Sequence, residues 1–314
     1  MPDLNEGAEL DTSQVEDMRG GGGGGGGGFG RGGGFPIPLP GGRLGGGIAG
    51  LVIMLILGYL GYSGNLPGLS DGGSGNAPAG DLAKECAVTN EQRFDRTDCR
   101  NLAYVNSIQA YWKSALPETL GQPYQMTTTR FFSDSVSTSC GQADSGIGPF
   151  YCPADSHVYI DLTFYDELST RFGASGQFAE AYVIAHEYGH HIQNVVGTSE
   201  QVHREQQRDP ANANQLSIRL ELQADCFAGA WATHAAETTD LKGNKLFESV
   251  TDKDIAEALQ AAAAVGDDAI QKKSGRGIDQ ESWTHGSSEQ RQRWFTTGFE
   301  SGDPRRCDTF SGGA

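Results

Sequence analysis

The sequence contains no cluster of basic residues interleaved with aromatic residues, which is the usual mark of a nucleic-acid-binding surface. Its 314 residues include 23 Lys and Arg against 40 Asp and Glu, a formal net charge of -17. An acidic surface of this kind repels a phosphate backbone and keeps a protein soluble. The composition therefore argues against nucleic acid as a partner.

Cysteine is missing from the chain before Cys86, and no Cys-x-x-Cys pair occurs anywhere, which argues against a cysteine zinc site. Six cysteines follow, and their even number predicts up to three disulfides in an oxidising compartment. Many connectivities are possible for six cysteines. The most local pairing joins Cys86 to Cys99 and Cys140 to Cys152, which leaves Cys226 for Cys307.

Charge is absent from residues 44–62, a run of 19 residues. As a helix this run would be roughly 28 Å long, enough to cross the hydrocarbon core of a membrane once. A cleaved signal peptide is the competing interpretation, but it requires a basic region at the amino terminus directly before a short apolar core. Here a long tail comes first, so residues 44–62 are predicted to be a single transmembrane helix.

Glycine dominates the chain before the predicted span. Such a composition buries too little apolar surface to offset the entropy of ordering, so residues 1–43 are predicted to be a disordered tail. Arg31 and Arg43 precede the span, whereas Asp71 is the first charge after it. The positive-inside rule therefore predicts a protein of the cell membrane with a cytoplasmic tail and an extracytoplasmic remainder. Residues 63–80 have the composition of a flexible linker.

Residues 81–314 are numerous enough for one sizeable core and are predicted to be a single domain. Apolar periodicity, strand-forming residues and terminal glycines predict helices at 98–116, 178–196, 215–236, 253–265 and 288–301, and strands at 126–132 and 157–164. Ser287 and Gln290 form a capping-box pattern at the start of the last helix.

The predicted helix at 178–196 contains His-Glu-x-x-His. His186 and His190 are four residues apart and therefore share one helix face, so both imidazoles can reach one cation. Glu187 lies about 100° further round the helix, where it can contact a water without binding the metal. A zinc hydrolase needs this arrangement, with Glu187 as the general base. Two ordinary buried histidines are the alternative, but burying them with a glutamate and no partner is costly.

Three other side chains of this helix receive lesser roles. His191 is also four residues from Glu187, but a site built on that pair would leave His186 and His190 unused. We expect His191 at the neighbouring surface or behind the metal ligands. Tyr182 and Tyr188 are expected in the core rather than in the chemistry.

A catalytic zinc keeps three protein ligands, so a third must come from elsewhere in the chain. Glu221 and Asp225 are one turn apart on the predicted helix at 215–236. Glu221 is the candidate third ligand, and Asp225 is expected to accept the second ring N–H of a ligating histidine. The small residues Ala224, Ala228 and Gly229 would let this helix approach the first one closely. A solvent-facing carboxylate pair is the alternative, which the apolar surroundings disfavour.

These motifs resemble the gluzincin clan of metallopeptidases, in which His-Glu-x-x-His is followed by Glu-x-x-x-Asp on a second helix. More closely, the chain is similar to the bacterial, membrane-anchored family called putative neutral zinc metallopeptidases. The resemblance runs from about Asp98 to Phe310 and is carried by several separated motifs in one order: Cys140-Gly, Gly148-Pro-Phe-Tyr-Cys-Pro153, Val158-Tyr-Ile-Asp161, His186-Glu-Tyr-Gly-His-His191, Glu221-Leu-Gln-Ala-Asp225, Thr284-His-Gly-Ser-Ser288 and Cys307-Asp-Thr-Phe310.

The resemblance implies an α+β, zincin-like fold, a Zn²⁺ cofactor and the hydrolysis of peptide or protein substrates. It also implies that residues 157–164 are the edge strand that holds an extended peptide. Thr284 and His285, followed by Arg291, look like a pair found in membrane-bound gluzincins, so His285 is a candidate catalytic residue that stabilises the oxyanion or orients the substrate. A structural role for His285 at the entry of the last helix is the alternative. A catalytically inactive, metal-binding scaffold tethered to the membrane is the alternative function.

Overall fold

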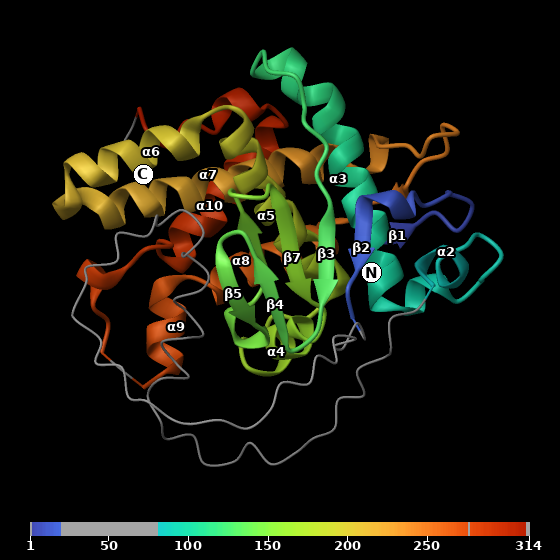
Figure 1. Cartoon of the computed structure of the whole chain (residues 1–314), viewed down its shortest axis with the longest axis horizontal. Coiled ribbons are helices and arrows are strands. Elements are labelled where there is room, and N and C mark those ends of the chain that lie inside the picture. Colours follow the sequence, from blue (N-terminus) through green and yellow to red (C-terminus); the bar gives the residue numbers. More distant parts are fainter. Residues whose placement is uncertain (1, 20–80, 276, 312–314) are drawn as a thin grey trace, which may run out of the picture.

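The computed structural model describes residues 2–19, 81–275 and 277–311, which form an α+β protein with mainly helical content (Figure 1). Its strands are β1 (Asp3–Leu4), β2 (Val15–Asp17), β3 (Thr129–Phe132), β4 (Ser135–Thr138), β5 (Gly141–Asp144), β6 (Phe150–Cys152), β7 (His157–Asp161) and β8 (Phe247–Ser249). Its α-helices are α2 (Leu82–Glu85), α3 (Thr97–Thr119), α4 (Phe164–Thr170), α5 (Gln177–Val195), α6 (Thr198–Arg208), α7 (Ala213–His234), α8 (Asp252–Ala264), α9 (Asp267–Lys273) and α10 (Ser288–Ser301). The predicted α+β class is confirmed.

The largest sheet of the described residues has the strand order β2-β3-β7-β6. The first three strands are parallel, and β6 runs antiparallel to β7. Helix α5 packs against β6 and β7, behind the sheet in the view of Figure 1. Four of the five residues of β7 are buried, as expected for a strand inside a sheet.

The strand predicted at 157–164 is present as β7, but the prediction that it lies at the edge of the sheet is wrong. β7 pairs with β3 on one side and with β6 on the other, so its backbone is already occupied. It also ends at Asp161, and α4 begins at Phe164. The outer strand on this side of the sheet is β6, which the sequence did not indicate because three residues show no periodicity.

The five predicted helices are confirmed as α3, α5, α7, α8 and α10, each with boundaries within three residues of the expected ones. The predicted capping box is present, since Ser287 accepts from Gln290 N and the Gln290 side chain accepts from Ser287 N. Gly302 then ends α10 in the left-handed conformation, with φ 59°. Local signals of this kind specify helix ends independently of the tertiary fold.

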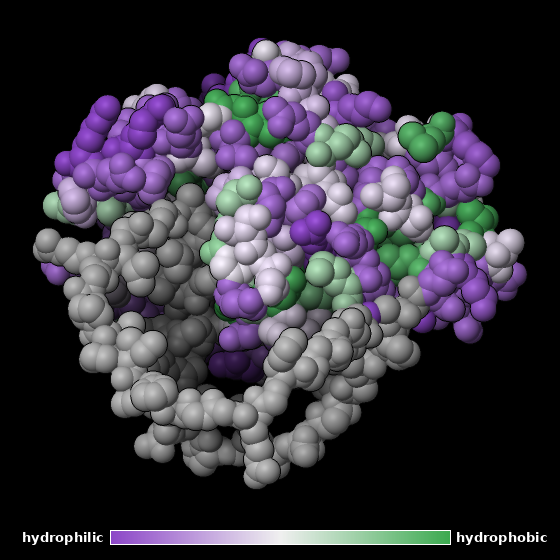
Figure 2. Space-filling view, viewed as in Figure 1, coloured by the Kyte–Doolittle hydropathy of each residue, from purple (hydrophilic) through white to green (hydrophobic). Residues whose placement is uncertain are grey.

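Helix α6 was not expected. It buries only Val202 and Gln206 and otherwise exposes hydrophilic side chains, seen as the purple area at the upper left of Figure 2. Val202 is the single apolar residue of this helix, so the sequence offers no repeated apolar positions that would indicate a helix here.

The three predicted disulfides are confirmed: Cys86–Cys99, Cys140–Cys152 and Cys226–Cys307. The first joins α2 to the start of α3. The second ties β6 to the residue that precedes β5, and the third ties α7 to the carboxyl-terminal segment.

The prediction of a disordered tail over residues 1–43 is wrong for residues 2–19, which belong to the fold. β1 pairs with β8, and β2 pairs with β3 at the end of the main sheet. Leu4, Ala8 and Val15 are buried. The folded unit therefore combines residues 2–19 with the predicted domain that begins at residue 81.

The predicted membrane span at 44–62 and the predicted linker at 63–80 lie outside the described residues. Among the helices that the structure does describe, none combines the length and the apolar character that a membrane crossing needs.

Helices α7 and α10 cross at two glycines, which makes their contact sensitive to a single methyl group. A Cβ on Gly298 would lie 1.9 Å from the carbonyl oxygen of Cys226, and one on Gly229 would lie 2.1 Å from that of Phe295. We expect Gly298→Ala to push the helices apart and to lower the free energy of unfolding by about 1–3 kcal/mol or more. Thermal unfolding followed by circular dichroism should show a lower Tm. The control is Gly277→Ala, where the added methyl meets nothing within 4 Å; equal Tm values for both variants would contradict the close crossing.

Candidate metal centre

The two helices that carry the predicted ligands touch at a small residue on each. A Cβ on Gly189 of α5 would lie 2.8 Å from the Cα of Ala224 on α7. This close approach brings the side chains on either side of Gly189 within reach of α7. The expectation that Gly229 serves the same contact is wrong, because Gly229 faces Phe295 of α10 instead.

His186, His190 and Glu221 converge from α5 and α7. One ligand atom from each lies within 4.8 Å of the others. Glu221 Oε2 is 3.2 Å from His186 Nε2, and Glu221 Oε1 is 3.2 Å from His190 Nε2. The structure thus brings together the three side chains that the sequence selected. Their role as metal ligands stays a prediction.

The electrostatics of this cluster favour a bound cation. Burial alone would raise the pKa of Glu221, but the imidazoles of His190 and His186 hold it well below its usual value. Burial lowers the pKa of His186, but the carboxylates of Asp225 and Glu221 outweigh burial and raise it to about 9. The cluster therefore draws positive charge, which a proton supplies in the absence of a metal ion.

Glu187 lies beside this cluster and is 1% exposed. Burial raises the pKa of its carboxyl to about 7, while the neighbouring His186 and His190 act in the opposite direction. Neither carboxylate oxygen has a hydrogen-bond partner in the described part of the chain. The main-chain N–H of Tyr151 on β6 lies near enough to favour the ionised form, although its geometry falls short of a hydrogen bond. A buried carboxylate that is free to take a proton suits a general base.

Asp225 fixes the orientation of His186 as expected. Its Oδ1 is 2.8 Å from His186 Nδ1 and accepts a 2.5 Å hydrogen bond from Tyr182 Oη. Arg291 of α10 binds both oxygens of Asp225, with its Nε at 2.8 Å and its Nη2 at 3.0 Å. With Nδ1 held by a carboxylate, Nε2 of His186 is directed towards Glu221.

Gln193 plays the corresponding part for His190. Its Oε1 is 2.9 Å from His190 Nδ1, and its Nε2 donates to the Leu220 carbonyl at 2.7 Å. Because one amide contacts both the second histidine of α5 and the backbone of α7, it couples the ring orientation to the helix contact. His190 is the most accessible of the three converging side chains, with 18% of its side chain exposed.

His191 is 1% exposed and lies behind the site, which excludes the first of the two expected positions, the surface, and agrees with the second. Its Nε2 donates to the Gln125 carbonyl at 2.6 Å, which leaves Nδ1 to accept from Tyr151 Oη at 3.1 Å. Asn194 donates to the same hydroxyl at 3.0 Å. These contacts anchor the edge strand β6 to α5 next to Glu187.

His285 is buried in the loop before α10. Its Nδ1 is 3.0 Å from Asp267 Oδ1, and Asp267 Oδ2 accepts the main-chain N–H groups of Thr284, His285 and Gly286. Asp267 therefore fixes both the loop and the ring. The catalytic role of His285 stays a prediction.

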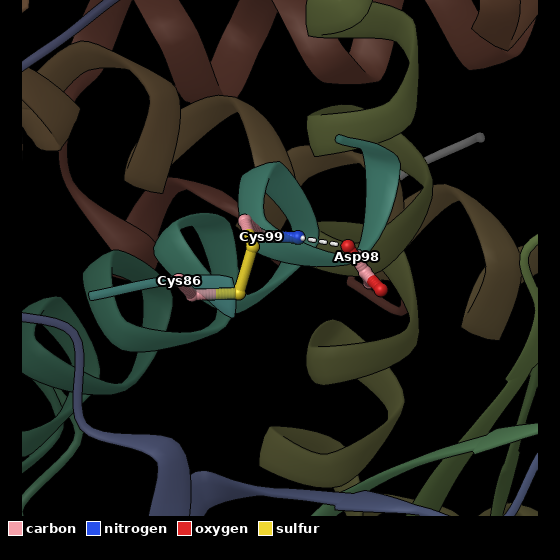
Figure 3. Close-up of side chains that lie close together, drawn as sticks. All are labelled: Cys86, Asp98 and Cys99. Atoms are coloured by element: carbon pink, nitrogen blue, oxygen red, sulfur yellow. Dashed lines mark hydrogen bonds between the residues drawn. A yellow bond between two sulfur atoms is a disulfide. The ribbon is translucent and has the colours of Figure 1, made fainter. Parts of the chain in front are cut away.

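Cys86, Asp98 and Cys99 form a second group of potential ligands. The two sulfur atoms are bonded to each other, and Asp98 Oδ1 accepts the main-chain N–H of Cys99 at 3.0 Å (Figure 3). Since metal binding requires thiolates, this group is structural.

The donor set of His186, His190 and Glu221 fits zinc. Two imidazoles and one carboxylate are the ligands of one class of catalytic zinc site. A tetrahedral site with bonds of about 2.0–2.1 Å separates its ligand atoms by roughly 3.3 Å, and both histidine-to-glutamate distances here are 3.2 Å. Glu221 Oε1 is buried without a hydrogen-bond partner among the described residues, as a metal-binding oxygen would be before it meets its cation.

Tyr182, Gln193 and Tyr151 are contacts of the site that the sequence did not reveal. Tyr182 precedes His186 by four residues and Gln193 follows His190 by three, so the helix period places both on the ligand face. The helical spacing of Tyr182 and Gln193 could therefore have indicated both contacts from the sequence. Tyr151 had no comparable signal, because its position depends on the pairing of β6 with β7.

Comparison with known proteins identifies the family of the chain. Residues 7–310 match the family described as "Putative neutral zinc metallopeptidase", which extends the expected resemblance to the amino-terminal segment. An uncharacterized protein of Mycobacterium tuberculosis is 46% identical over 237 residues, which are 75% of this chain and 77% of that protein. The uncharacterized protein YpfJ of Escherichia coli is 40% identical over 274 residues, 86% of this chain and 90% of that protein. No solved structure matches the chain.

Proposed function

The chain belongs to the family described as "Putative neutral zinc metallopeptidase", and from this premise we propose that it hydrolyses peptide bonds, with His186, His190 and Glu221 as zinc ligands. The observation that carries the proposal is the convergence of these side chains within 4.8 Å, with a buried, unpaired Glu187 beside them. A scaffold protein would have no need of an intact base at that position.

Glu187 is the proposed general base. It takes a proton from the attacking water and passes it to the nitrogen of the departing amine, so its carboxyl must be ionised at the start of each turnover. Zinc would supply positive charge that polarises the scissile carbonyl and acidifies the water. The same charge would lower the pKa of Glu187 and favour its ionised form.

Strand β6 is the proposed binding edge for the substrate. β6 is the edge strand beyond β7 in the main sheet. Tyr151 in the centre of β6 lies next to Glu187 of α5. An extended peptide can add to such an edge by main-chain hydrogen bonds, which require no particular side chains. The peptide would then pass beside the proposed zinc ligands with its backbone aligned.

The proposed place of action is outside the cytoplasm. Three disulfides join all six cysteines, which is typical of oxidising compartments. Attachment to the membrane through residues 44–62 stays a prediction.

Removal of the metal tests the proposed function. We expect the purified full chain to contain about one zinc per molecule and to cleave an unstructured protein such as casein. A chelator should reduce cleavage to background, and one equivalent of Zn²⁺ should restore it. Cleavage that persists in the zinc-free chain would contradict the proposal. Zinc binding with no cleavage of any peptide in a broad library would instead support the inactive, metal-binding scaffold.

A further inference from the structure

The amino-terminal segment, residues 2–19, occupies a surface of the main domain that is built to receive it. Its first strand pairs with β8, and its second extends the main sheet through β3. Between the strands, the main-chain N–H of Asp11 donates to Asn106 Oδ1 on α3 at 2.7 Å, and the Asp11 carbonyl accepts from Asn106 Nδ2 at 3.1 Å. The segment is thus bound to three separate parts of the domain.

Arg93 adds a buried polar contact to this segment. Its side chain has no exposed surface, yet its Nη2 donates to the carbonyl oxygens of Asn5, Glu6 and Ala8 at 2.9–3.0 Å. Its Nη1 donates to the Cys86 carbonyl at 3.2 Å. A buried guanidinium requires acceptors, and the amino-terminal segment provides three of them. Without that segment the charge of Arg93 would lack most of its acceptors.

A second arginine, Arg19, attaches the carboxyl-terminal end of the segment to the domain. Arg19 is 8% exposed and bridges Asp17 and Asp98, each at 2.7–2.8 Å. Asp98 is the residue beside the Cys86–Cys99 disulfide in Figure 3. The same disulfide-closed loop therefore carries Arg93 and Asp98, the two groups that bind the two ends of the segment.

We infer that residues 2–19 lie in the same compartment as residues 81–311, so that the chain leaves the domain after Arg19 and returns at Asp81 on one side of the membrane. Strand pairing and buried polar contacts form only between groups in one compartment. A segment that starts and ends on one side crosses a membrane an even number of times or not at all. The predicted topology, with a cytoplasmic amino terminus, one crossing and an extracytoplasmic domain, is incompatible with this arrangement.

Paired cysteines in the full chain test the inference inside cells. Glu16 of β2 faces Arg130 of β3, and Asp3 of β1 faces Ser249 of β8. Two double variants, Glu16→Cys with Arg130→Cys and Asp3→Cys with Ser249→Cys, each place a thiol on both partners. A site for a specific protease is inserted within residues 63–80. All native disulfides lie after this site, so only an engineered bond can hold the fragments together after cleavage.

We expect most of the chain to remain joined on a non-reducing gel for both pairs when free thiols are blocked in intact cells before lysis. The control pair, Glu16→Cys with Glu200→Cys, joins β2 to α6, which lie on opposite sides of the molecule in Figure 1. Its yield should be at least about tenfold lower. Fragments that separate in cells, although the purified variants form the bonds on oxidation, would overturn the inference.

Labelling of single cysteines provides a second measurement that needs no bond to form. Ser13 and Lys113 are both exposed, one in the amino-terminal segment and one on α3. A membrane-impermeant maleimide, added to cells stripped of their outer layers, should label Ser13→Cys and Lys113→Cys to the same extent. Labelling of one variant before permeabilisation and of the other only afterwards would overturn the inference.

Discussion

Replacing Glu187 with glutamine is expected to leave zinc bound and to lower the rate of peptide cleavage by about 10²–10⁴-fold, the usual contribution of a general base. Glutamine has nearly the same shape but cannot accept the proton of the attacking water. The site of this residue is buried and its oxygens lack hydrogen-bond partners in the described residues, so the amide loses no native contact. Cleavage of a fluorogenic peptide library and the zinc content of the same preparation are the measurements.

The matched control is Glu200→Gln on α6, because Glu200 is exposed and its ion pair among the described residues is with the nearby exposed Arg204. Its cleavage rate should equal that of the native chain. If Glu187→Gln cleaves peptides at an undiminished rate while it keeps its zinc, another group is the base. If it loses the zinc as well, Glu187 contributes to the metal site itself.

Removal of the Glu221 carboxylate is expected to cost most of the bound zinc. Changes to groups that only orient a ligand commonly weaken metal binding by 10–100-fold, so loss of a ligand should weaken it by at least about 100-fold. Glu221→Ala leaves the two histidines without the carboxylate that lies 3.2 Å from each. Titration with a competing chelator would give the Kd, and circular dichroism would show that the helices persist.

Glu237→Ala provides the comparison for this experiment. Glu237 follows the end of α7, and its side chain is 72% exposed. The zinc affinity of the Glu237→Ala variant should therefore match that of the native chain. A Glu221→Ala variant that binds zinc as tightly as the native chain would remove this residue from the ligand set. The proposed site would then lack the three ligands that a catalytic zinc requires.

Sequence signals that act within one helix gave reliable predictions. The His186 and His190 spacing, the capping box at Ser287 and the terminal Gly302 depend on contacts over a few residues, so they could be interpreted without the fold. Glu221 and Asp225 were selected because carboxylates are costly in apolar surroundings without a partner. The structure places both opposite the histidines of α5.

Features that depend on distant partners could not be predicted in this way. Strand β6 has three residues, and its position at the edge follows only from the register with β7. The amino-terminal segment offers few apolar residues, and its polar contacts include Arg93, Asp98 and Asn106, far along the chain. Arg291 reaches Asp225 only because α10 crosses α7 at paired glycines. In each case a tertiary contact decides the role.

The pairing of β1 with β8 also constrains when the amino-terminal segment can fold during synthesis. Strand β1 is synthesised long before its partner β8, which lies near residue 248, so β1 cannot pair until β8 has been made. Contacts between such distant segments form slowly, because closing a long loop costs entropy before any bond repays it. Until β8 is available, β1 lacks its strand partner, so a chain that ends before β8 would leave this backbone edge unpaired.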